Sequence, residues 1–153
     1  MTLPGLGFLG TSTHSVDKKN RVFVAKRFQD VLPRDEEGNR TAVLNAGTGG
    51  CIWMTTHEGF SALAKRFEGN PLDPDSQVDD ERDFYAHVAE VTLDSSGRVL
   101  LPAELRELCG IGEEVVMIGM RSRVEIWSTE GWARRQRGTL AARQLAAPRE
   151  GAN

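Results

Sequence analysis

The stretch VDKKNRVFV at residues 16–24 decides the fold, because the chain repeats it as LDSSGRVLL at residues 93–101. Each copy places an arginine four residues after an aspartate, with apolar residues on both sides. A second shared pattern, Ile-Trp and then Glu-Gly-aromatic, follows within residues 52–60 and again within 126–132. Two copies of one unit in a single chain predict a molecule with a pseudo-two-fold axis, which suits a partner that is itself repetitive.

Both copies of the motif have the residues of a tight turn between two strands. The turns are residues 17–20 and 94–97. An aspartate at the first position can accept hydrogen bonds from backbone N–H groups further along the turn. The last position is asparagine or glycine, which tolerate a positive φ better than other residues. The sequence therefore predicts four turn-structuring residues: Asp17, Asn20, Asp94 and Gly97.

Apolar runs between turn residues predict a mainly β protein with short helices, an α+β fold. The expected strands are residues 8–15, 22–24, 41–44, 51–54, 99–101, 115–118 and 124–127, with hairpin loops at 47–50 and 119–122. The expected helices are residues 25–32, 56–67, 102–109, one near 80–89 after a polar linker, and one that begins near 129. Residues 141–153 lack a periodic apolar face, so we expect a mobile tail there.

Charge is strongly segregated along this chain of 153 residues, although the net charge is only −3. Residues 10–34 carry six basic and two acidic side chains, and residues 133–153 carry five arginines and one glutamate. Residues 68–94 carry nine acidic side chains and one arginine. Each run has a plain interpretation as a solvated face. Because the local field governs polyanion binding, the first basic run is also a candidate nucleic-acid surface.

Patterns typical of enzymes, metal sites and membrane segments are absent from the sequence. The glycine-rich run at 47–50 lacks the Lys-Ser/Thr pair of a phosphate-binding loop, and no H-E-x-x-H or G-x-S-x-G motif occurs. Cys51 and Cys109 are too few for a disulfide framework, so we expect small buried side chains in a reducing cytosol. No apolar run approaches the roughly 18 residues of a membrane span, and no signal peptide is recognisable. We therefore expect no catalytic residue, no metal ligand and no cofactor.

The repeated Asp-x-x-x-Arg motif supports two interpretations. In the structural one, each aspartate accepts the N–H groups of its turn and pairs with the arginine. In the functional one, Arg21 and Arg98 project with Lys18 and Lys19 from one face toward phosphates or guanine edges. The first copy is the better candidate surface, because serines replace both lysines in the second copy.

At these motifs the chain resembles the MraZ family of bacterial transcriptional regulators, which carry two AbrB/SpoVT-type repeats. The resemblance covers roughly residues 8–132 and implies a pseudo-two-fold, swapped-hairpin AbrB-like β-barrel with appended helices. It rests on Phe8-Leu9-Gly10, Thr13-His14-Ser15, the two Asp-x-x-x-Arg turns, Leu101-Pro102-Ala103-Glu104-Leu105-Arg106 and the two Ile-Trp pairs. The implied units are a first repeat at 8–60, a helix and acidic linker at 61–88, a second repeat at 89–132, and a partly disordered Arg-rich helix or tail at 133–153.

The resemblance also implies a function, a set of DNA contacts and a location. Family members form ring-shaped homo-oligomers that bind short direct repeats upstream of their own operon, in the division and cell-wall gene cluster. Carried over, Arg21 is the leading DNA contact, with Lys18 and Lys19 beside it and Arg98 as its counterpart. The protein would be a repressor without enzymatic activity, located in the cytoplasm on the nucleoid, with no membrane or small-molecule partner.

The chain departs from the family pattern in its first copy, and a second function class stays open. Asn20 stands where the family usually has glycine, Ala25-Lys26 stands in place of Pro-Ala, and the family pattern has a small or polar residue near Phe23. The alternative is a protein-interaction or antitoxin-like scaffold, with the acidic residues 68–94 as the surface that meets a partner.

Overall fold

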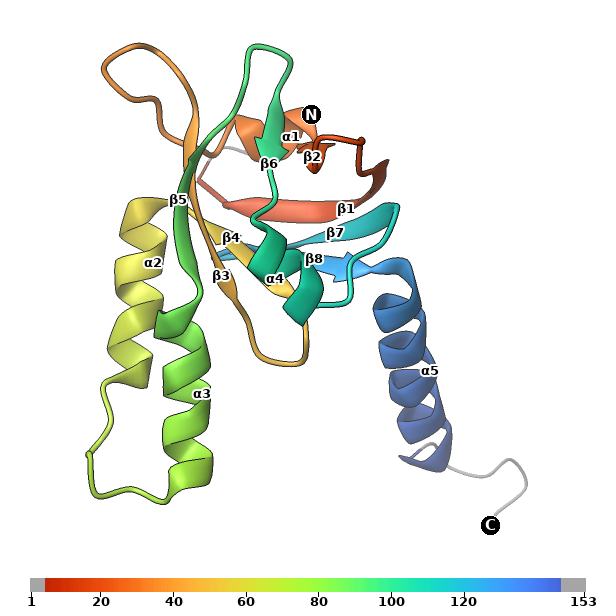
Figure 1. Cartoon of the computed structure of the whole chain (residues 1–153). Helices are drawn as coiled ribbons and strands as arrows, with labels where there is room; N and C mark the ends of the chain where they lie inside the picture. The colour runs from red at the N-terminus through yellow and green to blue at the C-terminus, as the bar shows by residue number, and fades with distance from the viewer. Residues whose placement is uncertain (1–4, 147–153) are drawn as a thin grey trace.

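The computed structural model of the chain describes residues 5–146, except for the side chains of residues 76 and 77 (Figure 1). The strands are β1 (Phe8–Ser15), β2 (Arg21–Phe23), β3 (Thr41–Ala46), β4 (Ile52–Thr55), β5 (Val88–Thr92), β6 (Arg98–Leu100), β7 (Glu114–Arg121) and β8 (Val124–Ser128). The helices are α1 (Lys26–Gln29), α2 (His57–Ala64) with a 3-10 turn η1 (Lys65–Phe67), α3 (Asp75–Ala86), α4 (Ala103–Leu108) and α5 (Thr129–Ala146). The predicted class, mainly β with short helices, is confirmed.

Each repeat gives its first strand to the other repeat. Six strands form one sheet in the order β1-β7-β8-β4-β3-β5. The first strands, β1 and β5, pair antiparallel with β7 and β3, which are the third strands of the opposite repeats. The fourth strands, β4 and β8, pair with each other at the centre. Exchanging the two repeats leaves this order unchanged, so the predicted pseudo-two-fold strand swap is present; closure of the strands into a barrel stays a prediction.

The second strands of the repeats, β2 and β6, form a separate two-stranded sheet that marks the pseudo-two-fold axis. Val22 lies opposite Val99 at its centre, and both are fully buried. On one side the N–H of Leu101 donates to the carbonyl of Asn20 over 2.8 Å, and on the other the N–H of Val24 donates to the carbonyl of Gly97 over 2.9 Å. Each turn is therefore hydrogen-bonded to the backbone of the opposite repeat.

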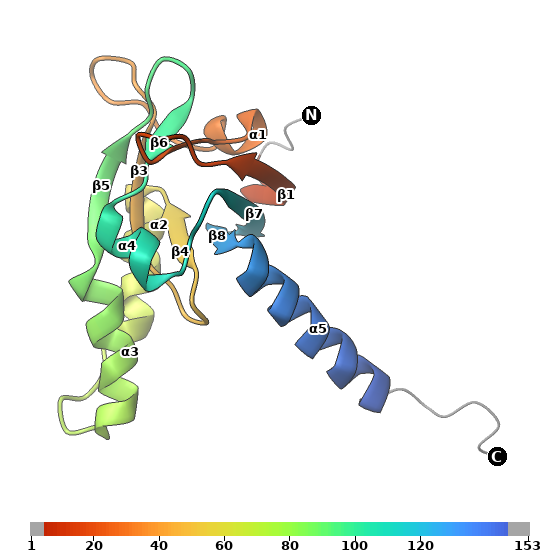
Figure 2. The same cartoon turned by 45° about the vertical axis from the view of Figure 1, so that its right-hand side comes forward.

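The core has one main cluster and one smaller cluster. Phe28 of α1 and Leu105 of α4 occupy equivalent positions of the two repeats, and both are buried in the main cluster. A smaller cluster lies where α2 and α3 pack side by side against the sheet (Figures 1 and 2). It contains Trp53, Phe84 and Trp127, and the Phe84 ring stacks on the Phe60 ring with centroids 5.1 Å apart. The two tryptophans of the repeated Ile-Trp pattern, Trp53 and Trp127, are thus core residues, and both cysteines are buried as expected.

Several element boundaries differ from the prediction, and the helices account for most of the difference. α3 begins at Asp75, earlier than predicted, and its Phe84 packs against Phe60 of α2 and Phe67 of η1. α5 continues to Ala146, so the predicted mobile tail is wrong for residues 141–146. Alanine, arginine, glutamine and leucine favour helix even without an apolar stripe. The rest of that predicted tail lies outside the described residues.

The remaining boundary differences concern short segments. β7 runs to Arg121 and occupies most of the predicted loop at 119–122, because it pairs with β1 along its whole length. α1 spans four residues where eight were predicted. Within residues 5–146, no helix is both long and apolar enough to cross a membrane.

Candidate nucleic-acid interface

The two Asp-x-x-x-Arg motifs form turns with the same hydrogen bonds. In the first, Asp17 Oδ1 accepts the N–H groups of Lys19 and Arg21 at 2.8 and 2.9 Å, and Oδ2 accepts Arg21 Nε at 3.1 Å. In the second, Asp94 Oδ1 accepts the N–H groups of Ser96 and Arg98 at 3.0 and 2.9 Å, and Oδ2 accepts Arg98 Nε at 3.0 Å. Each aspartate therefore organises the backbone of its turn and orients the arginine that follows.

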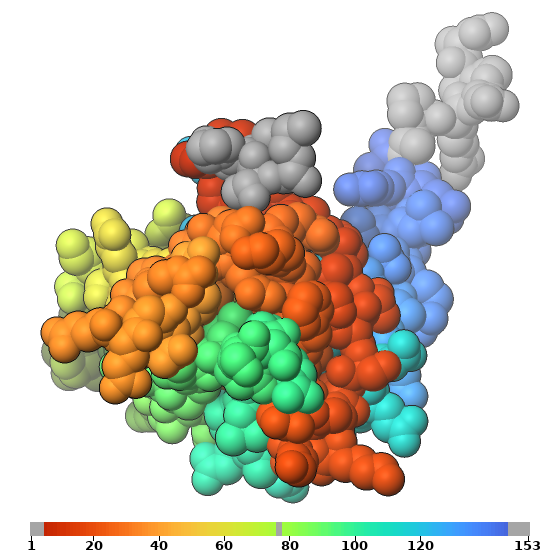
Figure 3. Space-filling view, turned by 90° about the horizontal axis from the view of Figure 1, so that it is seen from above, coloured from red at the N-terminus to blue at the C-terminus, as the bar shows by residue number. Residues whose placement is uncertain are grey.

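Strand exchange joins the two turns into one cluster, which we call the Asp–Arg frame: Asp17, Arg21, Asp94 and Arg98. Arg21 Nη1 lies 3.8 Å from Asp94 Oδ2, and Arg98 Nη1 lies 3.5 Å from Asp17 Oδ2. The four side chains are 30% to 35% exposed. Seen from above, the orange-red segment with the first turn and the green segment with the second lie side by side (Figure 3).

The frame is internally neutral because its carboxylates stay ionised. The backbone N–H of Arg21 is the main cause that holds the pKa of Asp17 below its ordinary value. The backbone N–H of Arg98 does the same for the pKa of Asp94. Two carboxylates then balance two guanidinium groups. A net positive charge on this face must therefore come from residues outside the frame.

The tips of the two turns, which lie outside the frame, differ in charge. Lys18 and Lys19 are exposed at the first tip, and no ion pair involves either within the described part of the chain. Ser95 and Ser96 occupy the second tip and are also exposed. The first tip therefore carries two positive charges and the second carries none.

The last residue of each turn has a positive φ and lies against a side chain of the opposite repeat. Asn20 has φ +62° and Gly97 has φ +78°. A Cβ atom at Gly97 would lie 2.3 Å from Nε2 of Gln29, so any other residue would need both the positive φ and a shift of the Gln29 side chain. Asn20 instead accepts a hydrogen bond from Arg106. Sequence reasoning missed Gln29 and Arg106, although both stand at the same distance from their own copy of the motif.

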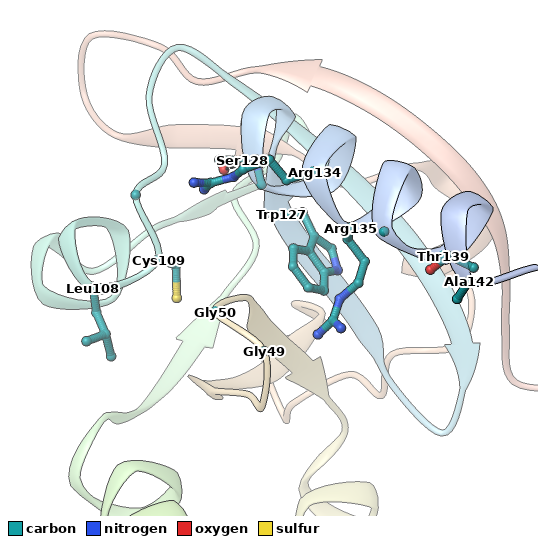
Figure 4. Close-up of a pocket in the computed structure, with 13 residues that line it drawn as sticks. Gly49, Gly50, Leu108, Cys109, Trp127, Ser128, Arg134, Arg135, Thr139 and Ala142 are labelled. Carbon is teal, nitrogen blue, oxygen red and sulfur yellow. Dashed lines mark hydrogen bonds between the residues drawn. The ribbon is translucent and has the colours of Figure 1, made fainter. Parts of the chain in front are cut away.

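Away from the two turns, a hollow lies between α5, α4 and the β3–β4 turn (Figure 4). Arg135 extends along Trp127, with its guanidinium carbon 5.5 Å from the ring centroid, toward Gly49 and Gly50. Cys109 lines the hollow, but burial raises the pKa of its thiol to about 11. Its thiol is therefore protonated at neutral pH and is a poor nucleophile.

The exchanged strands and joined turns define a two-repeat protein that presents a polar face with cations at one tip. A family model described as MraZ protein, antitoxin-like, matches residues 84–150. The transcriptional regulator MraZ of Syntrophomonas wolfei is 36% identical over 125 residues, which cover 82% of this chain and 83% of the relative. The protein of the same name from Carboxydothermus hydrogenoformans is 34% identical over 135 residues, which cover 88% of this chain and 90% of the relative. The chain belongs to the MraZ family of transcriptional regulators.

Proposed function

We propose that this protein is a sequence-specific DNA-binding transcriptional regulator that represses its own division and cell-wall operon. The DNA-binding surface is the first turn, with Lys18 and Lys19 at the tip, Arg21 behind them and Arg98 alongside. The observation that carries the proposal is the pair of exposed lysines beyond a frame whose own charges cancel. Membership of a family of transcriptional regulators supports double-stranded DNA as the partner.

In this mechanism the tip and the frame have separate roles. The lysines neutralise phosphates and release counterions, which gives affinity that depends on salt. Arg21 offers a planar guanidinium to a guanine edge or a phosphate. Asp17 and Asp94 hold that guanidinium before DNA arrives, so little side-chain entropy is lost on binding. No step requires a cofactor, a metal or catalysis, and the protein would act in the cytoplasm on the nucleoid.

Assembly into a ring would place several first turns at regular spacing along direct repeats. α5 carries four arginines and one glutamate, whereas α3 carries five acidic residues and one arginine. The two helices project from different sides of the body (Figures 1 and 2). Head-to-tail association of α5 with α3 of the next copy would bring opposite charges together. Linkage of several weak contacts then raises the effective concentration of each.

The test is fluorescence anisotropy of the protein on a duplex from upstream of its own gene, against a scrambled duplex, across a salt series. The proposal predicts a preference for the upstream duplex that persists as salt rises. Equal, salt-sensitive binding to both duplexes would reduce the proposal to a generic polyanion surface.

The alternative function is an antitoxin-like or protein-interaction scaffold, and a specific surface favours it. The acidic helix α3 is bordered by Leu72, which is 89% exposed, and carries Tyr85, which is 44% exposed. A partner with a basic, partly apolar surface fits there. Absence of binding to either duplex would favour this scaffold over the DNA-binding regulator.

A further inference from the structure

The short helix of the second repeat reaches across the pseudo-two-fold axis to the first turn. Arg106 of α4 donates from Nη1 to the Asn20 side-chain oxygen. The same guanidinium donates from Nε to the carbonyl of Ile111 at 3.1 Å and from Nη2 to the carbonyl of Gly112 at 2.9 Å. All three nitrogens are engaged, so the loop after α4 fixes the guanidinium that holds Asn20.

The equivalent position in the first repeat is Gln29 of α1, and this residue makes a different kind of contact with the second turn. Gln29 Nε2 donates to the carbonyl of Val24 at 2.7 Å and fills the space beside Gly97. Gly97 has no side chain for Gln29 to bind. Arginine with asparagine and glutamine with glycine are therefore two matched pairs at the same place in the two repeats.

The Arg106 bond matters because Asn20 has a backbone conformation that residues other than glycine seldom adopt. Its φ of +62° carries a steric cost that glycine does not have. The N–H of Asn20 closes the turn by donating to the carbonyl of Asp17 at 3.1 Å, and its carbonyl accepts the N–H of Leu101. Fixing Asn20 therefore fixes the two residues between it and Asp17, which are the two lysines.

We propose that Arg106 is a positioning residue for DNA binding. It holds Asn20 in the left-handed conformation and so sets the direction in which Lys18 and Lys19 leave the turn. This inference rests on the proposed function and extends it to a residue outside the Asp-x-x-x-Arg motif, in the repeat that carries no lysines. A turn held in its binding conformation loses less freedom on binding than a mobile one.

The test compares Arg106→Gln, Arg106→Lys, Asn20→Gly and the double variant Arg106→Gln with Asn20→Gly, by anisotropy on the upstream duplex. Arg106→Gln should weaken binding about tenfold, the size of one lost charge-assisted hydrogen bond. Arg106→Lys should weaken it similarly, because an ammonium cannot make the three directed bonds. The double variant should regain the affinity of Asn20→Gly, since glycine adopts the positive φ without support.

Gln29→Ala is the matched control, because it disturbs the second turn, which has serines at its tip. It should leave affinity nearly unchanged, and thermal unfolding of every variant verifies that the fold is retained. Affinity of Arg106→Lys equal to wild type, with Arg106→Gln weakened, would overturn the proposal and make Arg106 a simple phosphate contact. Unchanged affinity in Arg106→Gln would overturn it as well.

Hydrogen exchange of the free protein separates this inference from the proposed function. The N–H groups of Lys19 and Arg21 are bonded to Asp17, so they report on order in the first turn. Their exchange should be faster in Arg106→Gln and unchanged in Gln29→Ala. Unchanged exchange in Arg106→Gln overturns the positioning role, whatever the DNA result. If the wild type binds no DNA, the proposed function is overturned. Faster exchange of the Lys19 and Arg21 N–H groups in Arg106→Gln would still establish that Arg106 orders the first turn.

Discussion

The first and second turns of this protein have the same hydrogen-bond geometry but expose different side chains at their tips. The aspartate-to-backbone distances agree within 0.2 Å, and each arginine pairs with its own aspartate and with that of the other turn. The tips differ, with two lysines in one turn and two serines in the other. The comparison teaches that the Asp–Arg frame is an element of the fold common to both repeats. In the proposed function, the residues at the tips make the first turn a DNA contact and leave the second a structural turn.

The largest expected difference between the repeats is the response of DNA binding to loss of each arginine. Arg21→Ala should cost about 2 kcal/mol of binding free energy per turn, the usual worth of a directed arginine contact. Because the proposed ring would multiply this loss, repeat-specific binding should vanish while the oligomer persists. Arg98→Ala should have a smaller effect, because serines occupy the tip of its turn. Anisotropy and size-exclusion chromatography measure the two properties, and equal losses in both variants would remove the distinction between the turns.

Substitution of the last residue of each turn by alanine should lower the stability of the protein by different amounts. Gly97→Ala should lower the free energy of unfolding by about 2 kcal/mol, because the residue has a positive φ and its Cβ would collide with Gln29. Asn20→Ala should cost about 1 kcal/mol, since that site already accommodates a side chain. Urea unfolding compares them. A larger loss of unfolding free energy in Asn20→Ala than in Gly97→Ala would mean that the Gln29 side chain moves aside at little cost and that the Arg106 contact is the stronger constraint.

The smallest expected effect concerns acid stability, in which the two turns should behave alike. The folded-state pKa values of Asp17 and Asp94 are depressed, so their contribution to stability is present above the unfolded value, near pH 4. That contribution is lost as pH falls through the lower folded value. Asp17→Asn and Asp94→Asn should each destabilise the protein at pH 7 and reduce the fall in stability below pH 4. Unchanged pH dependence in the double variant would contradict the cause assigned to the two shifts.

The sequence predicted what local chemistry determines. An aspartate that accepts N–H groups two and four residues later needs only its own turn, so the positions of Asp17 and Asp94 followed from the repeat alone. The strands that carry Trp53 and Trp127 were predicted to within one residue, because their apolar runs have no competing pattern, whereas β5 was not predicted and β7 extends further than predicted.

Contacts that depend on strand exchange could not be predicted from local patterns. The pairs between Arg21 and Asp94 and between Arg98 and Asp17 exist only because β2 and β6 lie together. The bond from Arg106 to Asn20 has the same origin. Helix limits were missed where the apolar pattern is weak, as for Asp75, where α3 begins within a polar segment, and for Ala146 at the end of α5, where helix propensity outweighed the lack of an apolar stripe.

The central claim, that the two lysines at its tip distinguish the first turn from the second as a DNA contact, is tested most directly by exchanging the tips. Anisotropy on the upstream duplex across a salt series would compare wild type with Lys18→Ser/Lys19→Ser and with Ser95→Lys/Ser96→Lys. The account predicts that the first variant binds at least about tenfold more weakly and that its salt slope falls by about 1.8 for each turn engaged. The second variant should keep its preference for the upstream duplex. Unchanged affinity and slope in Lys18→Ser/Lys19→Ser would contradict the account.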